Sequence, residues 1–149
     1  MDAARAVELL RRIRHDYANH LQVISGYIEL ARYQEVKDYI AAMVEEMSEE
    51  RKIFESLDYE AVVYLYEKML SARDLGIILK YDELRISNTR ILENHNEPDK
   101  TLSSLLARLG KLNNEPVVYL SLFEDGKELE MIFDCEYFGD MPIRIRIKE

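Results

Sequence analysis

The stretch "LRRIRHDYANHLQVISGYIEL", residues 10–30, decides the fold of the N-terminal part of this chain. It contains no proline, and its apolar residues recur three or four positions apart, which is the spacing of one face of an α-helix. The pattern runs from about residue 3 to residue 32 and predicts one long amphipathic helix. Its apolar side comprises Val7, Leu10, Tyr17, Leu21, Ile24, Ile28 and Ala31, widened by Ile13 and Tyr27.

A second amphipathic run follows a short polar break at "RYQE", residues 32–35. Two long helices with a short connection are expected to fold back as an antiparallel hairpin. Such a hairpin cannot bury its long apolar stripes against itself, so we expect two copies to form a dimeric four-helix bundle, with coverage by the C-terminal half as the alternative. The second stripe comprises Val36, Tyr39, Ile40, Met43, Val44, Met47, Phe54 and Leu57.

The rest of the chain mixes helical and strand patterns, which predicts a small α/β domain after the hairpin. The fold class is therefore α+β, with a helical dimerisation domain at 1–57 and a second domain at 58–149. The second domain is expected to begin with a helix over 58–76, with Asp58 as N-cap and Gly76 as its stop, followed by a strand over 77–82. An irregular stretch over 83–100, with a loop around 94–100, should lead into a helix over 101–115 that is opened by Thr101 or Asp99 and closed by an Asn pair. A β-hairpin over 116–137, turning at Asp125-Gly126, and a last strand over 141–149 should complete the domain.

Composition excludes several classes of protein. The formal charge of −9 on 149 residues disfavours a nucleic-acid binder, because phosphate backbones select for a basic face. No apolar run is long enough to cross a bilayer and no signal-peptide pattern is visible, so a cytoplasmic protein without a membrane partner is expected. The single cysteine, Cys135, allows neither an intrachain disulfide nor a zinc cluster of cysteines.

The segment that contains "RHDYANH" is the least acidic part of the chain. Residues 1–34 carry five Lys or Arg against four Asp or Glu, and Arg11, Arg12 and Arg14 crowd beside His15. This distribution fits a site that handles an anion or docks on an acidic pocket, and it equally fits a solvated helix face.

Helical geometry separates the histidines. A helix advances about 100° per residue, so His15 lies about 200° from Tyr17, on the side away from the apolar stripe. Arg11, Asn19 and Gln22 fall within about 40° of His15, and Asp16 flanks it. His20 lies about 140° from His15 and is expected to be a partly buried, hydrogen-bonded packing residue. His95 falls in a polar loop and carries no functional signal.

The chemistry that suits His15 is nucleophilic phosphoryl transfer. A zinc-protease helix needs histidines four positions apart, whereas Asn19 occupies that position here, so no metal site is expected. Serine or cysteine catalysis lacks a glycine-rich elbow. An exposed imidazole beside a carboxylate, an amide and arginines can attack phosphorus while the neighbours orient the ring and balance charge.

These residues carry a family resemblance. Residues 10–30 resemble the phosphoacceptor helix of the sporulation-initiation phosphotransferase B family and of the related citrate/fumarate-type sensor kinases. The family pattern is matched position by position by Arg14, His15, Asp16, Asn19 and Leu21. The following "YQEVKDYI", residues 33–40, resembles the start of the family's second hairpin helix. The resemblance covers about residues 5–57.

The resemblance implies that His15 is phosphorylated and that hairpins of two chains form a four-helix bundle. Asp16, Arg14 and Asn19 are then expected to assist the transfer at His15. The remaining residues of the polar face, Arg11, Arg12 and Gln22, are expected to contact a response regulator and balance phosphate charge.

In the kinase members of this family an ATP-binding domain follows the hairpin. Its asparagine-containing helix should fall near 101–115, and its glycine loops near "FDCEYFGDMP", residues 133–142, but neither stretch has the required residues. Without paired glycines the backbone cannot approach a triphosphate, so we expect a degenerate ATPase-like domain without a functional nucleotide site. This chain should bind no cofactor, and Mg²⁺ is expected in the partner regulator.

The function predicted from the sequence is that of a histidine phosphotransferase, which relays phosphate between the receiver domains of response regulators in a two-component phosphorelay. Two alternatives stay open: a sensor-type histidine kinase or a fragment of one, and a non-enzymatic dimeric adaptor or inhibitor of a kinase or regulator. Binding of ATP would discriminate the first, and activity that survives loss of His15 would discriminate the second.

Overall fold

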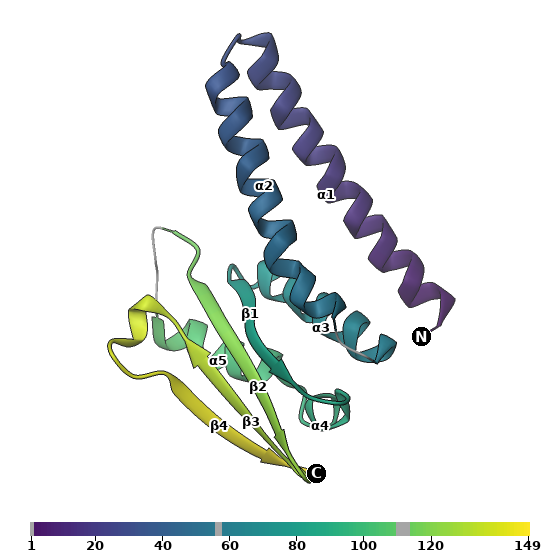
Figure 1. Cartoon of the computed structure of the whole chain (residues 1–149), viewed down its shortest axis with the longest axis vertical. Helices are drawn as coiled ribbons and strands as arrows, with labels where there is room; N and C mark the ends of the chain where they lie inside the picture. The colour runs from purple at the N-terminus through teal and green to yellow at the C-terminus, as the bar shows by residue number, and fades with distance from the viewer. Residues whose placement is uncertain (1, 56–57, 110–113) are drawn as a thin grey trace. The chain divides into compact units, whose positions relative to one another are not determined.

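The computed structural model describes residues 2–55, 58–109 and 114–149. The chain forms two compact units, of which the first ends at Ser48 and the second begins at Glu49 (Figure 1). The predicted domain boundary at residues 57 and 58 touches residues 56–57, which lie outside the described part. Among the helices described here, none combines the length and hydrophobicity that a membrane span requires.

The first unit is a hairpin of two long helices, α1 (Ala3–Glu29) and α2 (Tyr33–Phe54). Asp2 caps α1, because its side chain accepts a hydrogen bond from the Arg5 backbone N–H at 2.7 Å. The connection is shorter than predicted and lies earlier, since α2 already begins at Tyr33. Glu35 in its first turn favours helix there, next to the positive end of the helix dipole, and pairs with Arg32 at 2.7 Å.

The hairpin leaves a large apolar surface exposed. None of the residues of α1 is buried, and Ile53, the buried residue of α2, lies in the part of that helix that belongs to the second unit. Successive positions at about 100° place five exposed apolar residues of α1 within about 40° of Leu21, on one continuous stripe, whereas the exposed Val23 lies about 160° away. The stripe comprises Val7, Leu10, Tyr17, Leu21 and Ile28 on α1, and its counterpart on α2 comprises Tyr33, Ile40, Val44 and Met47.

The second unit is a four-stranded sheet with helices, which confirms the predicted α+β class. The strand order is β1-β2-β3-β4; β1 and β2 run parallel, and the other two pairs are antiparallel. In chain order the elements are α3 (Tyr59–Asp74), β1 (Ile78–Arg85), α4 (Arg90–Asn94), α5 (Asp99–Leu109), β2 (Val117–Asp125), β3 (Glu128–Asp134), the short 3₁₀ helix η1 (Glu136–Phe138) and β4 (Ile143–Lys148).

One face of this sheet carries the core. Alternate residues of the strands point into it, as the period of two in a strand requires. Buried residues of α3 and α5 join the same cluster, so both helices pack on this face. Ile53, from the last turn of α2, is 1% exposed and belongs to it as well. The strand residues of the core include Leu79, Tyr81, Val118, Leu120, Leu122, Leu129, Met131 and Phe133.

Several predicted elements are confirmed. Asp58 caps α3 through a 3.1 Å bond from the Glu60 N–H, and Gly76 follows the helix with a positive φ of 83°. β2 and β3 form the predicted hairpin, which turns through Gly126 at a φ of 63°. Positive φ values of this kind suit glycine because it has no Cβ.

The structure differs most from the sequence-based prediction over residues 83–100. This stretch was expected to be irregular, but β1 continues to Arg85, α4 forms at 90–94, and α5 begins at Asp99. Ile91 and Leu92 are buried, so two apolar residues are enough to hold a short helix in an otherwise polar stretch. Thr101 lies inside α5 and does not open it.

Two further predictions concern residues outside the described part. The Asn pair expected to close the helix over 101–115 consists of Asn113 and Asn114. Asn113 lies outside the described residues, and Asn114 is described and is not helical. Leu57, expected on the apolar stripe of the second helix, is also outside. The strand predicted up to residue 137 ends at Asp134, where η1 takes over after Cys135.

Candidate functional site

His15 stands on the middle of α1 and points into solvent. Its side chain is 74% exposed. Its Nδ1 atom lies 3.4 Å from the Asn19 amide nitrogen, one helical turn away, and 3.8 Å from the Asp16 carboxylate. Within the described residues no hydrogen bond is recorded for the other ring nitrogen, Nε2. The contacts of the ring therefore gather at Nδ1, and Nε2 is the more open of the two ring nitrogens.

The residues predicted around His15 divide into two groups. Arg11, Asn19 and Gln22 are exposed and share the His15 face, although Arg11 already pairs with Glu8 at 2.6 Å. Arg12 is half-buried, at about 60° from His15. Arg14 is exposed but lies about 20° from Leu21, within the apolar stripe of α1, and about 100° from His15 around the helix.

His20 has a structural environment, as the sequence predicted. One of its ring nitrogens, Nδ1, is 2.6 Å from the hydroxyl of Tyr39 on α2. The two rings also meet edge-to-face at 5.7 Å, and Tyr27 packs against the same tyrosine at 6.4 Å. His20 thereby ties α1 to α2.

His95 has a partner that the sequence did not indicate. Its Nε2 atom lies 2.6 Å from the carbonyl oxygen of Lys148, 53 positions along the chain. Two residues so far apart in the sequence produce no local pattern, so the sequence around His95 gave no indication of this contact. Cys135, the single thiol of the chain, is buried, with only 3% of its surface exposed.

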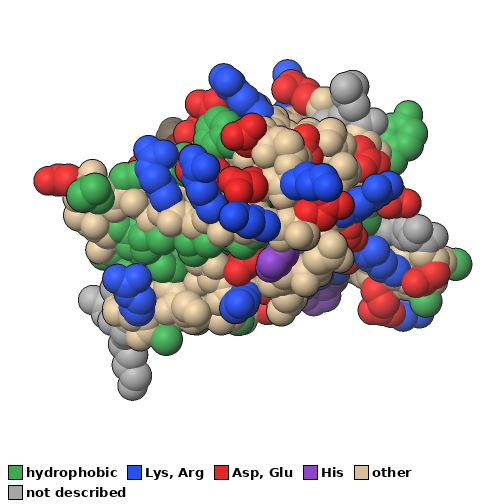
Figure 2. All heavy atoms as spheres, turned by 90° about the horizontal axis from the view of Figure 1, so that it is seen from below, with side chains coloured by type: hydrophobic (Ala, Val, Ile, Leu, Met, Phe, Trp, Pro, Cys, Tyr) green, Lys and Arg blue, Asp and Glu red, His purple; other side chains and the backbone are tan. Residues whose placement is uncertain are grey.

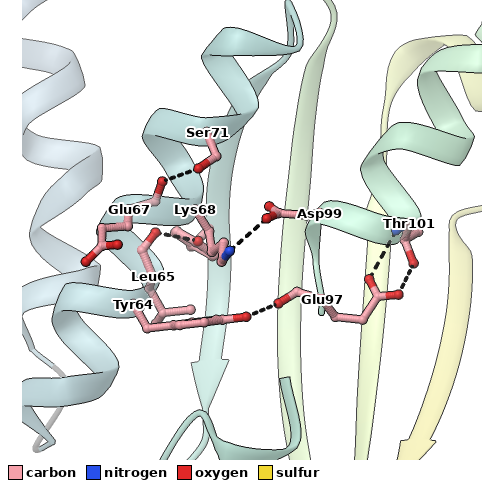
Figure 3. Close-up of polar contacts among 9 residues, drawn as sticks. Tyr64, Leu65, Glu67, Lys68, Ser71, Glu97, Asp99 and Thr101 are labelled. Atoms are coloured by element: carbon pink, nitrogen blue, oxygen red, sulfur yellow. Dashed lines mark hydrogen bonds and ion pairs between the residues drawn. The ribbon is translucent and has the colours of Figure 1, made fainter. Parts of the chain in front are cut away.

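A second polar cluster joins α3 to the start of α5 (Figure 3). The Tyr64 hydroxyl donates to the backbone carbonyl of Glu97. Lys68 Nζ lies 2.7 Å from Asp99 Oδ2 and 5.0 Å above the Tyr64 ring. The Glu97 carboxylate, 4% exposed, accepts bonds from the Thr101 hydroxyl at 2.9 Å and from the Thr101 backbone N–H at 3.2 Å.

This cluster is a structural clamp. Its charged groups are matched: Glu97 accepts two hydrogen bonds, and Asp99 meets an ammonium. Asp99 Oδ1 is the buried side-chain atom recorded without a hydrogen-bond partner among the described residues, and the charge on Lys68 beside the same carboxylate offsets the cost of that burial. The cluster fixes the first turn of α5 against α3. The part of the chain that is described contains no cluster of three or more His, Cys, Asp or Glu that could hold a metal.

The surface of the molecule carries charges of both signs. On the face that Figure 2 draws, Lys and Arg side chains are interspersed with Asp and Glu side chains. On β3 and β4 this alternation consists of pairs, such as Arg146 with Glu130 at 3.1 Å and Lys148 with Glu128 at 3.4 Å. Such paired charges differ from the basic stripe that nucleic-acid binding requires.

Comparison with known protein families identifies the helical part. The model of the family described as "Sensor_kinase_SpoOB-type, alpha-helical domain" matches residues 1–56. The match contains α1, α2 and the whole of the "RHDYANH" segment, and it confirms the resemblance stated from the sequence for this part of the chain. None of the curated proteins compared matches the chain.

Proposed function

We propose that this chain is a histidine phosphotransferase that relays a phosphoryl group between response regulators through His15. The observation that carries the proposal is the placement of His15: an exposed imidazole whose neighbours contact Nδ1 and leave Nε2 open, on a helix of the SpoOB type. The match of residues 1–56 to this domain family supports a protein related to phosphorelays and histidine kinases.

The reaction consists of two displacements at phosphorus. The lone pair of Nε2 attacks the aspartyl phosphate of the first regulator, an N–P bond forms, and the aspartate carboxylate leaves. The carboxylate of the second regulator then attacks the phosphohistidine, the N–P bond breaks, and the neutral imidazole returns. The receiver domains would supply Mg²⁺.

The neighbours of His15 would set the tautomer and the orientation of its imidazole ring. A proton on Nδ1 leaves the Nε2 lone pair free, and the Asp16 carboxylate at 3.8 Å favours that tautomer. In that tautomer the Asn19 amide would present its carbonyl oxygen to Nδ1–H, because the amide nitrogen that lies 3.4 Å from Nδ1 can only donate. Arg11, Arg12 and Gln22 lie on or beside the His15 face, where they would contact a regulator and balance the phosphoryl charge.

The same proposal includes a homodimer. The exposed stripes of α1 and α2 are the kind of apolar surface that soluble proteins cover with a partner. Because both stripes run along a hairpin, a second hairpin related by a two-fold axis can cover them as a four-helix bundle. His15 lies about 120° from the stripe, so pairing would leave it accessible.

The test is transfer of label from a receiver domain. Receiver domains of response regulators are loaded with ³²P by acetyl phosphate and mixed with the purified chain, and we expect an acid-labile, base-stable phosphoramidate on the chain. His15→Gln should abolish labelling, whereas His20→Ala should retain it. Asp16→Asn should slow transfer without abolishing it, since general acid–base help contributes about 10²–10⁴ in rate. Arg14→Ala should also slow transfer, because it removes one of the positive charges that would balance the phosphoryl group.

The alternatives give different results in the same experiment. Labelling of His15 by [γ-³²P]ATP alone, without a regulator, would indicate a histidine kinase. An effect on a kinase or regulator that the His15→Gln protein retains in full would indicate an adaptor. A label found on His20 or His95 would refute the assignment of the phosphoacceptor.

A further inference from the structure

A cavity of about 390 Å³ opens on the second unit, between α5 and the segment that connects β3 to β4. Leu105, Phe138 and Ile143 form its apolar floor. Leu105 is 3% exposed, and the other two are half-buried and pack against the core. The lining side chains are apolar or aromatic except Arg108, and clefts of about this size are typical binding sites for small molecules.

The rim of the cavity keeps large apolar side chains in water. Tyr137 is 44% exposed and Met141 is 77% exposed, and both line the opening. Single exposed apolar residues are common, but two beside an apolar cavity form a continuous surface that a ligand could cover. A ligand with an apolar body fits this part of the site.

One positive charge borders the cavity. Arg108 of α5 is exposed and lines it, and no ion pair is recorded for it within residues 2–55, 58–109 and 114–149. Within the same described ranges, Arg14, Arg51 and Arg90 likewise have no recorded carboxylate partner, but Arg108 is the arginine among the residues that line the cavity. Guanidinium groups bind carboxylates through two parallel hydrogen bonds.

Other groups in the connecting segment do not cancel this charge at the cavity. Glu136 and Asp140 belong to the segment but are not among the lining residues. The pKa of Tyr137 is raised, first by loss of solvation and then by the neighbouring Glu136 carboxylate, so its phenol stays neutral at physiological pH. Arg108 therefore sets the sign of the charge at the wall.

We propose that this cavity binds a small amphipathic carboxylic acid, with its apolar body against Leu105, Phe138 and Ile143 and its carboxylate on Arg108. The cavity lies between α5 and the segment that includes residues 137–143, and neither has the asparagine or paired glycine residues of a nucleotide site. A triphosphate would need several backbone N–H groups and cations, whereas this wall offers one arginine and apolar side chains. The site is separate from His15 and does not depend on phosphotransfer.

The test uses decanoate as the probe and the full chain with ¹³C-labelled Ile, Leu and Met methyl groups. Below its micelle-forming concentration, decanoate should bind saturably with one molecule per chain and shift the methyl signals of Leu105, Met141 and Ile143. Decyltrimethylammonium has the same chain length and the opposite charge, so it should bind roughly tenfold more weakly or worse.

Two variants locate the site. Arg108→Gln should weaken decanoate binding roughly tenfold or more, while Arg90→Gln, an exposed arginine on α4, removes the same charge elsewhere and should leave the affinity unchanged. Met141→Asp places a carboxylate on the exposed rim and should also weaken binding. Backbone amide spectra of each variant establish that the fold is retained.

Several results would overturn the proposal. They are the absence of saturable binding at millimolar decanoate, equal binding of the cationic probe, and unchanged affinity in both Arg108→Gln and Met141→Asp. ATP that displaces decanoate and shifts the same methyl signals would show a nucleotide site instead. None of these results bears on labelling of His15, so the two proposals fail separately.

Discussion

Leu21→Ala offers the sharpest test of the bundle, because Leu21 occupies the centre of the exposed stripe of α1. Its side chain is 65% exposed in the isolated chain, so its packing contributes little to the fold of one protomer. We expect the variant to fold as the wild type does and to dimerise more weakly. Weak dimerisation with an intact fold is the result that separates assembly from folding.

The magnitude follows from the exposed fraction. Full burial of a leucine side chain stabilises by about 1.5–3 kcal/mol, and roughly two thirds of that remains to be gained when a partner covers Leu21. Alanine keeps part of it, which leaves about 1–1.5 kcal/mol per protomer. A two-fold dimer loses this contribution twice, so the dimer dissociation constant should rise roughly 30- to 150-fold.

Sedimentation equilibrium over a concentration series measures the dissociation constant directly. Leu30→Ala is the matched control: Leu30 is 68% exposed, ends the same helix and lies about 180° from Leu21. It should leave dimerisation nearly unchanged. The reasoning is wrong if the wild type sediments as a monomer at ~100 μM, if Leu21→Ala dimerises normally, or if Leu30→Ala weakens the dimer as much.

Three further predictions concern the folded units. Tyr39→Phe removes the hydroxyl that contacts His20 at 2.6 Å, so thermal unfolding of the hairpin should show a loss of about 1 kcal/mol, while labelling of His15 continues. Ile53→Ala should cost the second unit about 2–4 kcal/mol in urea unfolding, whereas the exposed neighbour Phe54→Ala should cost clearly less. Burial, and then the charges of Tyr64 and Asp99, raise the pKa of Tyr81 well above its ordinary value of about 10. The folded state therefore holds that proton more tightly than the unfolded state, so stability should be complete below about pH 10 and fall as the pH rises further; Tyr81→Phe should flatten this alkaline decline in urea titrations.

Local patterns predicted the long elements of this fold well. The α1 and α2 repeats are strong because each apolar residue occupies a position set by the helical period, and the β2–β3 hairpin has Gly126 at its turn. The exposure of His15 followed from the same periodicity. The period did not distinguish Ile13 and Tyr27, which are half-buried, from Leu21, which is exposed, although all three were assigned to one stripe.

The stretch 83–100 shows where local reasoning failed. Its helices depend on contacts with distant residues: Tyr64 holds the carbonyl of Glu97, and Lys68 holds Asp99. Ile91 and Leu92 are too few to set up a periodic signal, yet their burial stabilises α4. The bond between His95 and Lys148 is a similar case, because no local pattern marks either residue as half of a pair.

The angular arrangement on α1 also gives Arg14 a role different from that of its neighbours. His15, Arg11 and Gln22 share one side of the helix, whereas Arg14 lies about 20° from Leu21 in the stripe that a second hairpin would cover. A guanidinium inside an apolar interface needs a carboxylate, and in a bundle the second copy is the molecule placed to supply one. Loss of Arg14 would then weaken the dimer as well as transfer, while loss of Asn19 would affect transfer alone. The matched motif residues would thus act on two different steps, although they are neighbours in the sequence.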